Sequence, residues 1–320
     1  ALQSNSIADA LREGYNLNPW YIGLLVAIAA GVVVIGGVKR IAAYSEWLVP
    51  IMGGLYLLLA VIVLFMNFGA IPSAIITIIK SAFTGKAAAG GAIGVGIMGI
   101  IQALVPAVSA GVPRAVLATE AGLGSASIAA AAAKTRSATQ MAIISATSVF
   151  WAIFICSLTG MVIVLAGDWQ NPNVYAANLC NSAVKSVPFS GTPILIFSLV
   201  IFSFTTIIGW GYYMEKALQF LCKGANTLIK PARVLFIILV FVGGWIGTSF
   251  SWDWTITDSL LRTAEANNST RFMWALAIFT MTMMTVPNIW ALWCFRKVII
   301  KTTRKNIKNI VGRKPKTAAN

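Results

Sequence analysis

Long apolar stretches that carry almost no charged residue recur along this chain, and they restrict the folds open to it more than any other feature. The clear stretches cover residues 19–38, 47–67, 140–166, 193–213, 232–250 and 272–295. A helix that crosses a bilayer needs about 20 consecutive, mostly apolar residues. Charged residues make up only 10% of the sequence, whereas soluble proteins contain about 25%. The sequence therefore predicts an all-α polytopic membrane protein.

The basic residues predict how these stretches are oriented. The chain has 24 lysines and arginines, and many of them lie in short clusters between the apolar stretches. If a further span covers about 109–134 and the glycine-rich region 87–107 does not cross, most clusters fall on one side, which the positive-inside rule makes cytoplasmic. We therefore expect about seven transmembrane helices in a bacterial-type inner membrane, with an external re-entrant or interfacial helix at 87–107. The N-terminus is then external, and the tail 301–320 is cytoplasmic.

Composition also excludes several classes of function. Histidine is absent, which removes imidazole metal sites and histidine-based catalytic triads. The net charge of +15 does not indicate nucleic acid, because nine of the 24 basic residues lie in the single segment 296–316. That segment is typical of a cytoplasmic tail beside membrane lipid, and binding of a specific lipid or partner is the alternative. The cysteines are far apart and are predicted to be single thiols: Cys156, Cys180, Cys222 and Cys294.

The stretch LATEAGLGSASIAAAAAKTR, residues 117–136, combines an acid with glycines inside an apolar span. Gly122 and Gly124 each weaken a helix by about 1 kcal/mol relative to alanine. We expect the helix to break at Thr119–Gly122. Irregular backbone at membrane depth is tolerated only where it is buried in protein or lines a cavity, and transporters bind substrates and cations at such breaks. The alanines that follow are typical of close helix packing.

Glu120 is the only acidic residue inside a predicted span. An ionisable group at this depth is costly and therefore a candidate functional residue. The alternative is that its carboxylate binds the broken-helix backbone or a neighbouring basic group such as Arg114, and so ties the broken ends together. A single buried acid without histidine supplies no acid–base pair. The sequence therefore predicts that the chain is not an enzyme.

A second polar group lies in FSFTTIIGWGYYMEKAL, residues 202–218. Thr205 and Thr206 place adjacent hydroxyls inside an apolar span, and hydroxyl and carbonyl oxygens suit a hard cation such as sodium. The alternative is that each hydroxyl bonds a carbonyl of its own helix. Trp210 lies between two glycines, where it either covers a small pocket or belongs to the aromatic belt at the membrane interface.

These segments resemble the alanine or glycine:cation symporter family, within the amino acid–polyamine–organocation superfamily. The signature is GVPRAVLATEAGLGSASIAAAAAKT, and further family-like segments follow in the expected order: QSNSIADAL (3–11), IGGVKRIAAYSEWLVPIM (35–52), FTTIIGWGYYMEKAL (204–218) and MMTVPNIWAL (283–292). The resemblance implies a five-plus-five inverted-repeat fold. Residues 1–90 are then the remainder of the first repeat, 91–300 the second repeat with its broken helix at about 109–134, and 301–320 the tail.

The resemblance also implies the sites. The family pattern places substrate against the unwound stretch and its neighbours, which correspond here to Gln3, Leu117, Ala118, Thr119, Glu120, Gly122 and Trp210. It places sodium, a co-substrate rather than a cofactor, partly on Thr205 and Thr206. Three positions depart from the family, which has Phe, Ser and Asn where this chain has Leu117, Ala118 and Thr119. These departures bear on which small amino acid is preferred.

The expected function is sodium-coupled import of alanine or glycine by alternating access, without a cofactor. The glycine-rich broken helix of the first repeat, which supplies the other half of both sites, has no counterpart before Gln3. We therefore expect N-terminal helices to be missing from this sequence, and this chain alone to be inactive. The alternatives are a truncated, non-transporting membrane protein that serves as a scaffold or is a relic, and a proton-coupled amino acid transporter.

Overall fold

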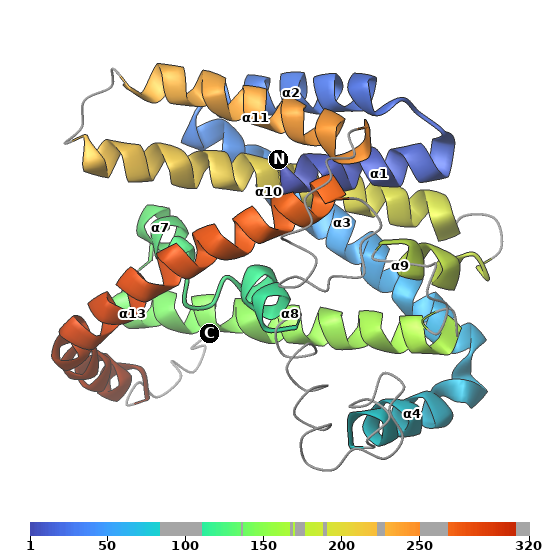
Figure 1. The fold of residues 1–320 in the computed structure, drawn as a ribbon. Helices are drawn as coiled ribbons and strands as arrows, with labels where there is room; N and C mark the ends of the chain where they lie inside the picture. Colours follow the sequence, from blue (N-terminus) through green and yellow to red (C-terminus); the bar gives the residue numbers. More distant parts are fainter. Residues whose placement is uncertain are drawn as a thin grey trace, which may run out of the picture. The chain divides into compact units, whose positions relative to one another are not determined.

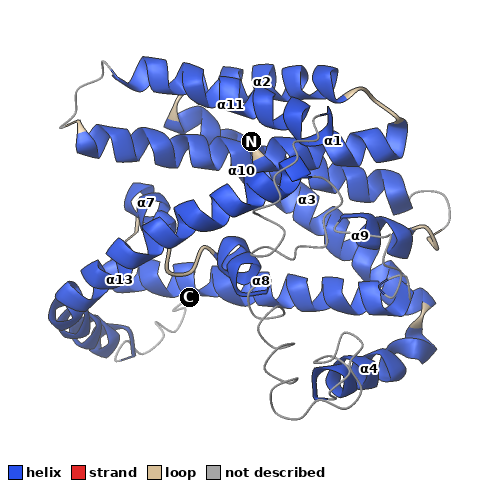
Figure 2. Cartoon of the chain, in the orientation of Figure 1, coloured by secondary structure: helices blue, strands red, loops and turns tan. Residues whose placement is uncertain are grey.

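Helices and no strands make up the regular structure of the described part of the chain, with short loops between the helices (Figures 1 and 2). The computed structural model describes residues 1–83, 111–135, 137–166, 169, 177–187, 191–222, 228–249 and 268–311. The helices are α1 (Leu2–Tyr15), α2 (Pro19–Ile35), α3 (Val38–Met66), η1 (Phe68–Ala70), α4 (Ile71–Phe83), α7 (Ser125–Ala132), α8 (Ala138–Ala166), α9 (Ala177–Val184), α10 (Gly191–Leu221), α11 (Ile229–Ser249) and α13 (Asn268–Val311). The region 87–107 lies outside the described residues.

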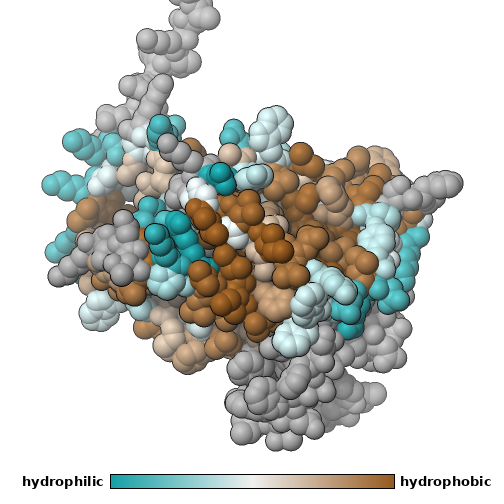
Figure 3. Space-filling model, turned by 90° about the horizontal axis from the view of Figure 1, so that it is seen from above, coloured by the Kyte–Doolittle hydropathy of each residue, from teal (hydrophilic) through white to brown (hydrophobic). Residues whose placement is uncertain are grey.

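Several helices match the apolar stretches of the sequence. Among the described residues, four helical stretches are long and apolar enough to cross a membrane: Arg40–Met66, Ala138–Ala166, Gly191–Leu221 and Met273–Asn306. The helix α2 is shorter, at 17 residues, and also apolar. Large apolar side chains remain exposed on these helices, as hydrophobic side chains do over much of the surface in Figure 3. Lipid is the natural environment for such surfaces, and the chain is an integral, multi-pass membrane protein.

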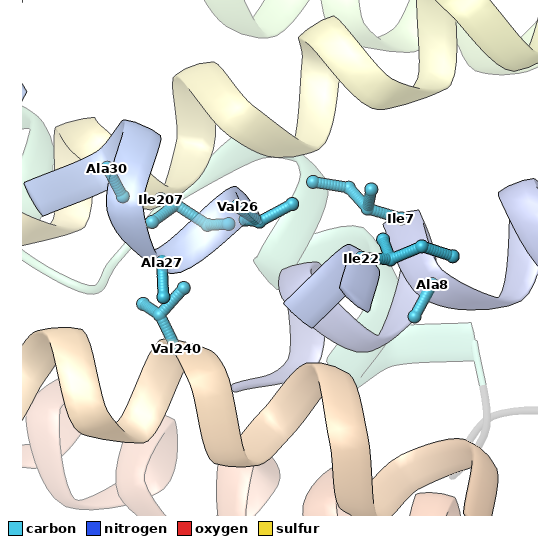
Figure 4. Packing of buried hydrophobic residues seen from close by; sticks show 8 residues of the cluster. All are labelled: Ile7, Ala8, Ile22, Val26, Ala27, Ala30, Ile207 and Val240. Carbon is cyan, nitrogen blue, oxygen red and sulfur yellow. The ribbon is translucent and has the colours of Figure 1, made fainter. Parts of the chain in front are cut away.

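The chain divides into two compact units. The first comprises Ala1–Gly111 and Ile155–Leu276, and the second comprises Val112–Phe154 and Ala277–Asn320. In the first unit, α1, α2, α10 and α11 pack together. Their core contains Ile7, Ala8, Ile22, Val26, Ala27, Ala30, Ile207 and Val240 (Figure 4). Small residues bring the backbones close, since a Cβ atom at Gly23 would lie 3.1 Å from the carbonyl oxygen of Phe241.

The entry of the chain into α2 follows from its local sequence. The Asn18 side chain accepts a hydrogen bond from the Trp20 backbone N–H at 3.0 Å, and Pro19 occupies the first helical position. Asparagine is favoured at the N-cap, and proline is tolerated at the position after it, where no intrahelical donor is needed. The next helix, α3, begins after Gly37, whose φ of 75° favours glycine.

An ion pair joins α10 and α11. Arg233 Nη2 lies 2.7 Å from Glu215 Oε2, and Arg233 Nε donates to the same oxygen at 3.2 Å. Arg233 Nη1 donates to the carbonyl of Ile35, at the end of α2, at 3.4 Å. Gln219 Nε2 donates to Glu215 Oε1 at 3.3 Å. Glu215 is only 7% exposed, so this group of polar contacts connects α2, α10 and α11 from a largely buried position.

The position of Glu215 corrects an expectation from the sequence. The predicted span ends at residue 213, which would leave Glu215 at a helix end. Instead, α10 continues to Leu221 and buries the carboxylate. The carboxylate can be buried because Arg233 compensates its charge, and a buried ion needs such a partner. Glu120 is therefore one of at least two acids inside apolar helical regions.

The Cys180 thiol is expected to react slowly with maleimide at neutral pH. Cys180 lies in α9 and packs beside a cluster that contains Leu59, Val184 and Leu195. Burial raises the pKa of Cys180 from 9.0 to about 11. Because the thiolate is the reactive form, a thiol with this raised pKa is only roughly 0.1% thiolate at pH 8, compared with roughly 10% for one with the ordinary value. The labelling rate should therefore rise about tenfold per pH unit between pH 8 and pH 10.

The measurement uses a variant in which the other three free cysteines are replaced by serine: Cys156, Cys222 and Cys294. Maleimide labelling of Cys180 is followed by mass spectrometry over the pH series. The same variant unfolded in detergent and urea is the control, because unfolding removes the burial and restores ordinary reactivity. Equal labelling rates for the folded and unfolded protein at pH 8 would contradict the raised pKa.

Candidate functional site

The second unit contains an interruption between two helical segments. Residues 111–119 are helical, and α7 begins at Ser125. Between them, three residues adopt positive φ: Glu120 at 51°, Gly122 at 84° and Gly124 at 82°. Glycine takes such values without strain, whereas a residue with a side chain does so at a cost. The interruption covers residues 120–124 and so overlaps the predicted break at Thr119–Gly122, with Thr119 still the last helical residue before it.

The polar groups of the interruption bond largely to one another. Ser125 Oγ donates to Glu120 Oε2 at 2.7 Å, which joins the start of α7 to the residue that follows the first helical segment. The Leu123 N–H donates to the Glu120 carbonyl at 3.3 Å. Thr119 Oγ1 donates to the Ala115 carbonyl at 2.8 Å. The Glu120 carboxylate therefore connects the two sides of the break, which is the structural alternative to a direct functional role.

A side chain from α13 also holds the interruption. Asn288 Nδ2 donates to the Gly122 carbonyl at 2.9 Å. A Cβ atom on Gly124 would lie 3.0 Å from Asn288 Oδ1, and a Cβ atom on Gly122 would lie 4.0 Å from Thr285 Cγ2. Asn288 is not among the site residues predicted from the sequence, although an amide beside Pro287 in an apolar span is a visible signal.

The two helix ends give the interruption its electrostatic character. The last carbonyls of a helix and the first N–H groups of the next have no partners within their helices. They carry partial negative and positive charge respectively. Here the carbonyl end of residues 111–119 and the N–H end of α7 are separated by the five residues 120–124. A zwitterionic amino acid has the complementary charges, an ammonium group and a carboxylate.

The two threonines of the predicted sodium site lie on α10 in the first unit. Thr205 Oγ1 and Thr206 Oγ1 both donate to the Phe202 carbonyl at 2.9 Å. Thr205 Oγ1 also lies 3.9 Å from the Met52 sulfur of α3. These bonds match the alternative in which each hydroxyl bonds its own helix. They use the hydroxyl hydrogens, so the oxygen lone pairs remain suited to a cation.

The other predicted substrate residues of the first unit are Gln3 and Trp210. Gln3 lies in the first turn of α1, and α1 packs against α10. Trp210 is half-buried on α10 and contacts Tyr213 edge-on, with ring centroids 5.7 Å apart. The predicted residues Leu117, Ala118, Thr119, Glu120 and Gly122 are contiguous at the break of the second unit. Whether the two groups form one pocket stays a prediction.

Comparisons with known proteins agree with these features. A sequence model of the sodium:alanine symporter family matches residues 1–268. An "Uncharacterized transporter" of Haemophilus influenzae is 35% identical over 305 residues, which are 94% of this chain and 60% of the relative. The sodium/alanine symporter AgcS of Methanococcus maripaludis is 36% identical over 263 residues, 81% of this chain and 55% of the relative. The probable sodium/glutamine symporter GlnT of Bacillus subtilis is 28% identical over 301 residues, 93% of this chain and 56% of the relative.

These matches extend over most of the chain. They also show that the chain spans between half and two thirds of the length of the curated relatives that it matches. The residues that the family model matches, 1–268, include Gln3, residues 117–124, Thr205 and Thr206. The resemblance deduced from the quoted segments is confirmed, and the chain belongs to the sodium:alanine symporter family.

Proposed function

We propose that this protein is a secondary active transporter that imports a small neutral amino acid, alanine or glycine, together with sodium. The observation that carries the proposal is the interruption at residues 120–124, with a helix end on each side. The ammonium group of the substrate meets the carbonyl end of residues 111–119, and its carboxylate meets the N–H end of α7. In other transporters, half-helix N-termini bind the carboxylate of an amino acid substrate. Leu117, Ala118 and Thr119 line the substrate side.

Sodium binds beside Thr205 and Thr206 in this proposal. Their hydroxyl oxygens supply two hard ligands, and backbone carbonyls supply others. Inward flow of sodium down its gradient drives uptake, and the two repeats of a five-plus-five inverted fold rock around the sites. Gln3, in the first turn of α1, and Trp210 on α10 are further substrate-binding residues in this proposal. The protein lies in the inner membrane, its basic C-terminal tail faces the cytoplasm, and it transports without catalysing a reaction.

Uptake by the full-length protein tests the proposal. Proteoliposomes are given labelled alanine, glycine or glutamine, with and without an inward sodium gradient. We expect sodium-dependent uptake of alanine or glycine, with glutamine a poorer substrate. A proton gradient applied in sodium-free buffer examines the proton-coupled alternative. Uptake that does not depend on sodium but is driven by the proton gradient would contradict the sodium proposal. Absence of any uptake by the full-length protein would favour the non-transporting alternative.

Thr206→Val is expected to raise the sodium concentration for half-maximal uptake about tenfold, which corresponds to about 1.4 kcal/mol. Valine keeps the shape of threonine and removes the oxygen ligand. The matched control is Thr282→Val on α13, because Thr282 Oγ1 also donates to a carbonyl of its own helix, that of Ile278, at 2.9 Å. The sodium dependence of uptake is measured for both variants. Equal half-saturation in the two variants would exclude Thr206 from the cation site.

A further inference from the structure

Asn288 is a polar residue with an amide side chain in a mostly apolar segment of α13. It follows Pro287 in α13, within the segment MMTVPNIWAL. Proline has no N–H, so the carbonyl one turn earlier loses its helical donor and the helix is locally weakened. Polar side chains inside transmembrane segments are costly and usually serve a purpose. The purpose must be sought in what the amide contacts.

The contact is the unwound backbone itself. Asn288 Nδ2 donates to the Gly122 carbonyl at 2.9 Å, across 166 positions of sequence. Gly122 has a φ of 84° and belongs to neither flanking helix. Its carbonyl therefore lacks the N–H donor that a carbonyl inside a helix would have. The amide of Asn288 provides it.

The approach between α13 and the break is close. A Cβ atom on Gly124 would lie 3.0 Å from Asn288 Oδ1 and 3.2 Å from Asn288 Cγ. Both contacts are tighter than most real Cβ contacts, so beside any larger residue the Asn288 amide would have to shift by a few tenths of an ångström. Thr285, one turn earlier on α13, faces Gly122 with its methyl group at 4.0 Å from such a Cβ position. Thr285 and Asn288 are three residues apart and so share one face of the helix.

We propose that Asn288 is a positioning residue for substrate binding: its amide fixes the Gly122 carbonyl and thereby sets the distance and direction between the two helix ends of the break. The inference rests on the proposed function, because it takes the break as the substrate site. Asn288 itself does not need to touch the substrate. With the Gly122 carbonyl bonded to α13, the ammonium group is left to the carbonyls at the end of residues 111–119.

The test combines transport with local hydrogen exchange in the full-length protein. Asn288→Leu removes the donor without adding charge and keeps a similar size. We expect the KM for alanine to rise about tenfold and the maximal rate to change less than twofold. Sodium binding measured without alanine should not change. Deuterium exchange in peptides that cover residues 117–128 should become faster, because the break loses its link to α13.

Asn306→Leu is the matched control. Asn306 is also an asparagine of α13 in the second unit, and its Nδ2 donates to Thr139 Oγ1 on α8 at 3.1 Å. This variant loses an interhelical amide bond of the same kind, away from the break. It should leave both the KM and the exchange of residues 117–128 unchanged. If Asn288→Leu and Asn306→Leu raise the KM and the exchange rate of residues 117–128 to the same extent, the cause is a general loosening of the helices, and the proposal is overturned.

Asn288→Asp gives a readout that a purely structural role would not produce. An ionised carboxylate cannot donate to the Gly122 carbonyl, whereas a protonated one can. The KM of this variant, divided by that of the wild type at each pH, should therefore fall as pH is lowered. A ratio that is constant from pH 8 to pH 5 would contradict donation from position 288.

The outcomes separate the two proposals. Unchanged exchange in Asn288→Leu would overturn the positioning role of Asn288, whatever the transport data show, and would not affect the proposed function. Faster exchange with an unchanged KM would overturn the positioning role of Asn288 in substrate binding, while the alanine uptake from which the KM is measured would still support the proposed function; absence of uptake by the wild type is what would overturn that function. Faster exchange together with a raised KM, absent from Asn306→Leu, is the result that we expect.

Discussion

Gly124→Ala is expected to lower sodium-driven alanine uptake by the full-length protein at least tenfold while leaving the protein folded. Two physical effects combine at this position. The φ of Gly124 is 82°, and an L-residue there costs about 1–2 kcal/mol. The added Cβ atom would also lie 3.0 Å from Asn288 Oδ1, so the amide has to move and its bond to the Gly122 carbonyl is weakened. The measurement is initial uptake rate per folded transporter, with folding checked by gel filtration.

Two further glycines separate these effects. Gly122→Ala introduces the strain of a positive φ, 84°, but its Cβ atom meets only Thr285 Cγ2 at 4.0 Å. Gly54→Ala in α3 introduces neither, because nothing lies within 4 Å of its Cβ position. Alanine in a helix interior is favoured over glycine by about 0.5–1 kcal/mol, so Gly54→Ala should retain full uptake. We expect uptake to fall in the order Gly54→Ala, Gly122→Ala, Gly124→Ala; equal uptake in all three would contradict a defined backbone at the break.

The membrane helices could be predicted from the sequence because an apolar stretch in lipid has few structures open to it. A spanning segment has to satisfy its backbone hydrogen bonds internally, and a helix does so within about 20 residues. The predicted spans 47–67, 140–166, 193–213 and 272–295 therefore fall within α3, α8, α10 and α13, apart from a residue at one end. The ends are less predictable. The helix α10 continues past residue 213 to Leu221, and Glu215 is buried there beside Arg233, 18 positions away, a partner that a local average of hydropathy does not include.

The candidate site shows the same distinction between local and distant contacts. The break is encoded by Gly122 and Gly124, whose effect on a helix is local. The bond between Ser125 and Glu120 spans five positions, and the sequence already indicates that the carboxylate ties the broken ends. Asn288 could not be placed at the break in this way, because 166 positions separate it from Gly122. Only the packing of α13 brings the two together, and one sequence carries no direct signal of such a pair.

Residue type alone does not decide the role of the threonine pair Thr205 and Thr206. Adjacent hydroxyls in an apolar span predict either a cation site or bonds to the same helix, and the structure has Thr205 and Thr206 both bonded to the Phe202 carbonyl. These two interpretations are compatible, because a hydroxyl that donates its hydrogen still presents its oxygen. Whether the pair also binds sodium is therefore a question about function, and the sodium dependence of uptake by Thr206→Val addresses it directly.

Glu215→Gln is expected to lower the thermal unfolding temperature of the protein by about 5–10 °C, because it leaves Arg233 without its counter-charge. Removing one partner of a buried ion pair costs about 3–5 kcal/mol. Here the arginine side chain is 20% exposed, which reduces the loss to about 2–3 kcal/mol. The measurement is unfolding in lipid nanodiscs, followed by tryptophan fluorescence. Lys216→Met is the neighbouring control: its Nζ bonds Gln219 Oε1 at 2.9 Å, a contact to a neutral group, and its loss should shift unfolding by less than about 2 °C.

The double variant Glu215→Gln/Arg233→Gln distinguishes a compensated charge pair from two independent residues. With both charges removed, no ion is left buried, so the double variant should be more stable than the sum of the two single variants predicts. The reversed pair, Glu215→Arg/Arg233→Glu, should recover only part of the stability. A carboxylate at position 233 has no hydrogen to donate to the Ile35 carbonyl, which Arg233 Nη1 contacts at 3.4 Å. If the losses of the two single variants simply add, the pair does not act as a unit, and the connection of α2, α10 and α11 must depend on their apolar core alone.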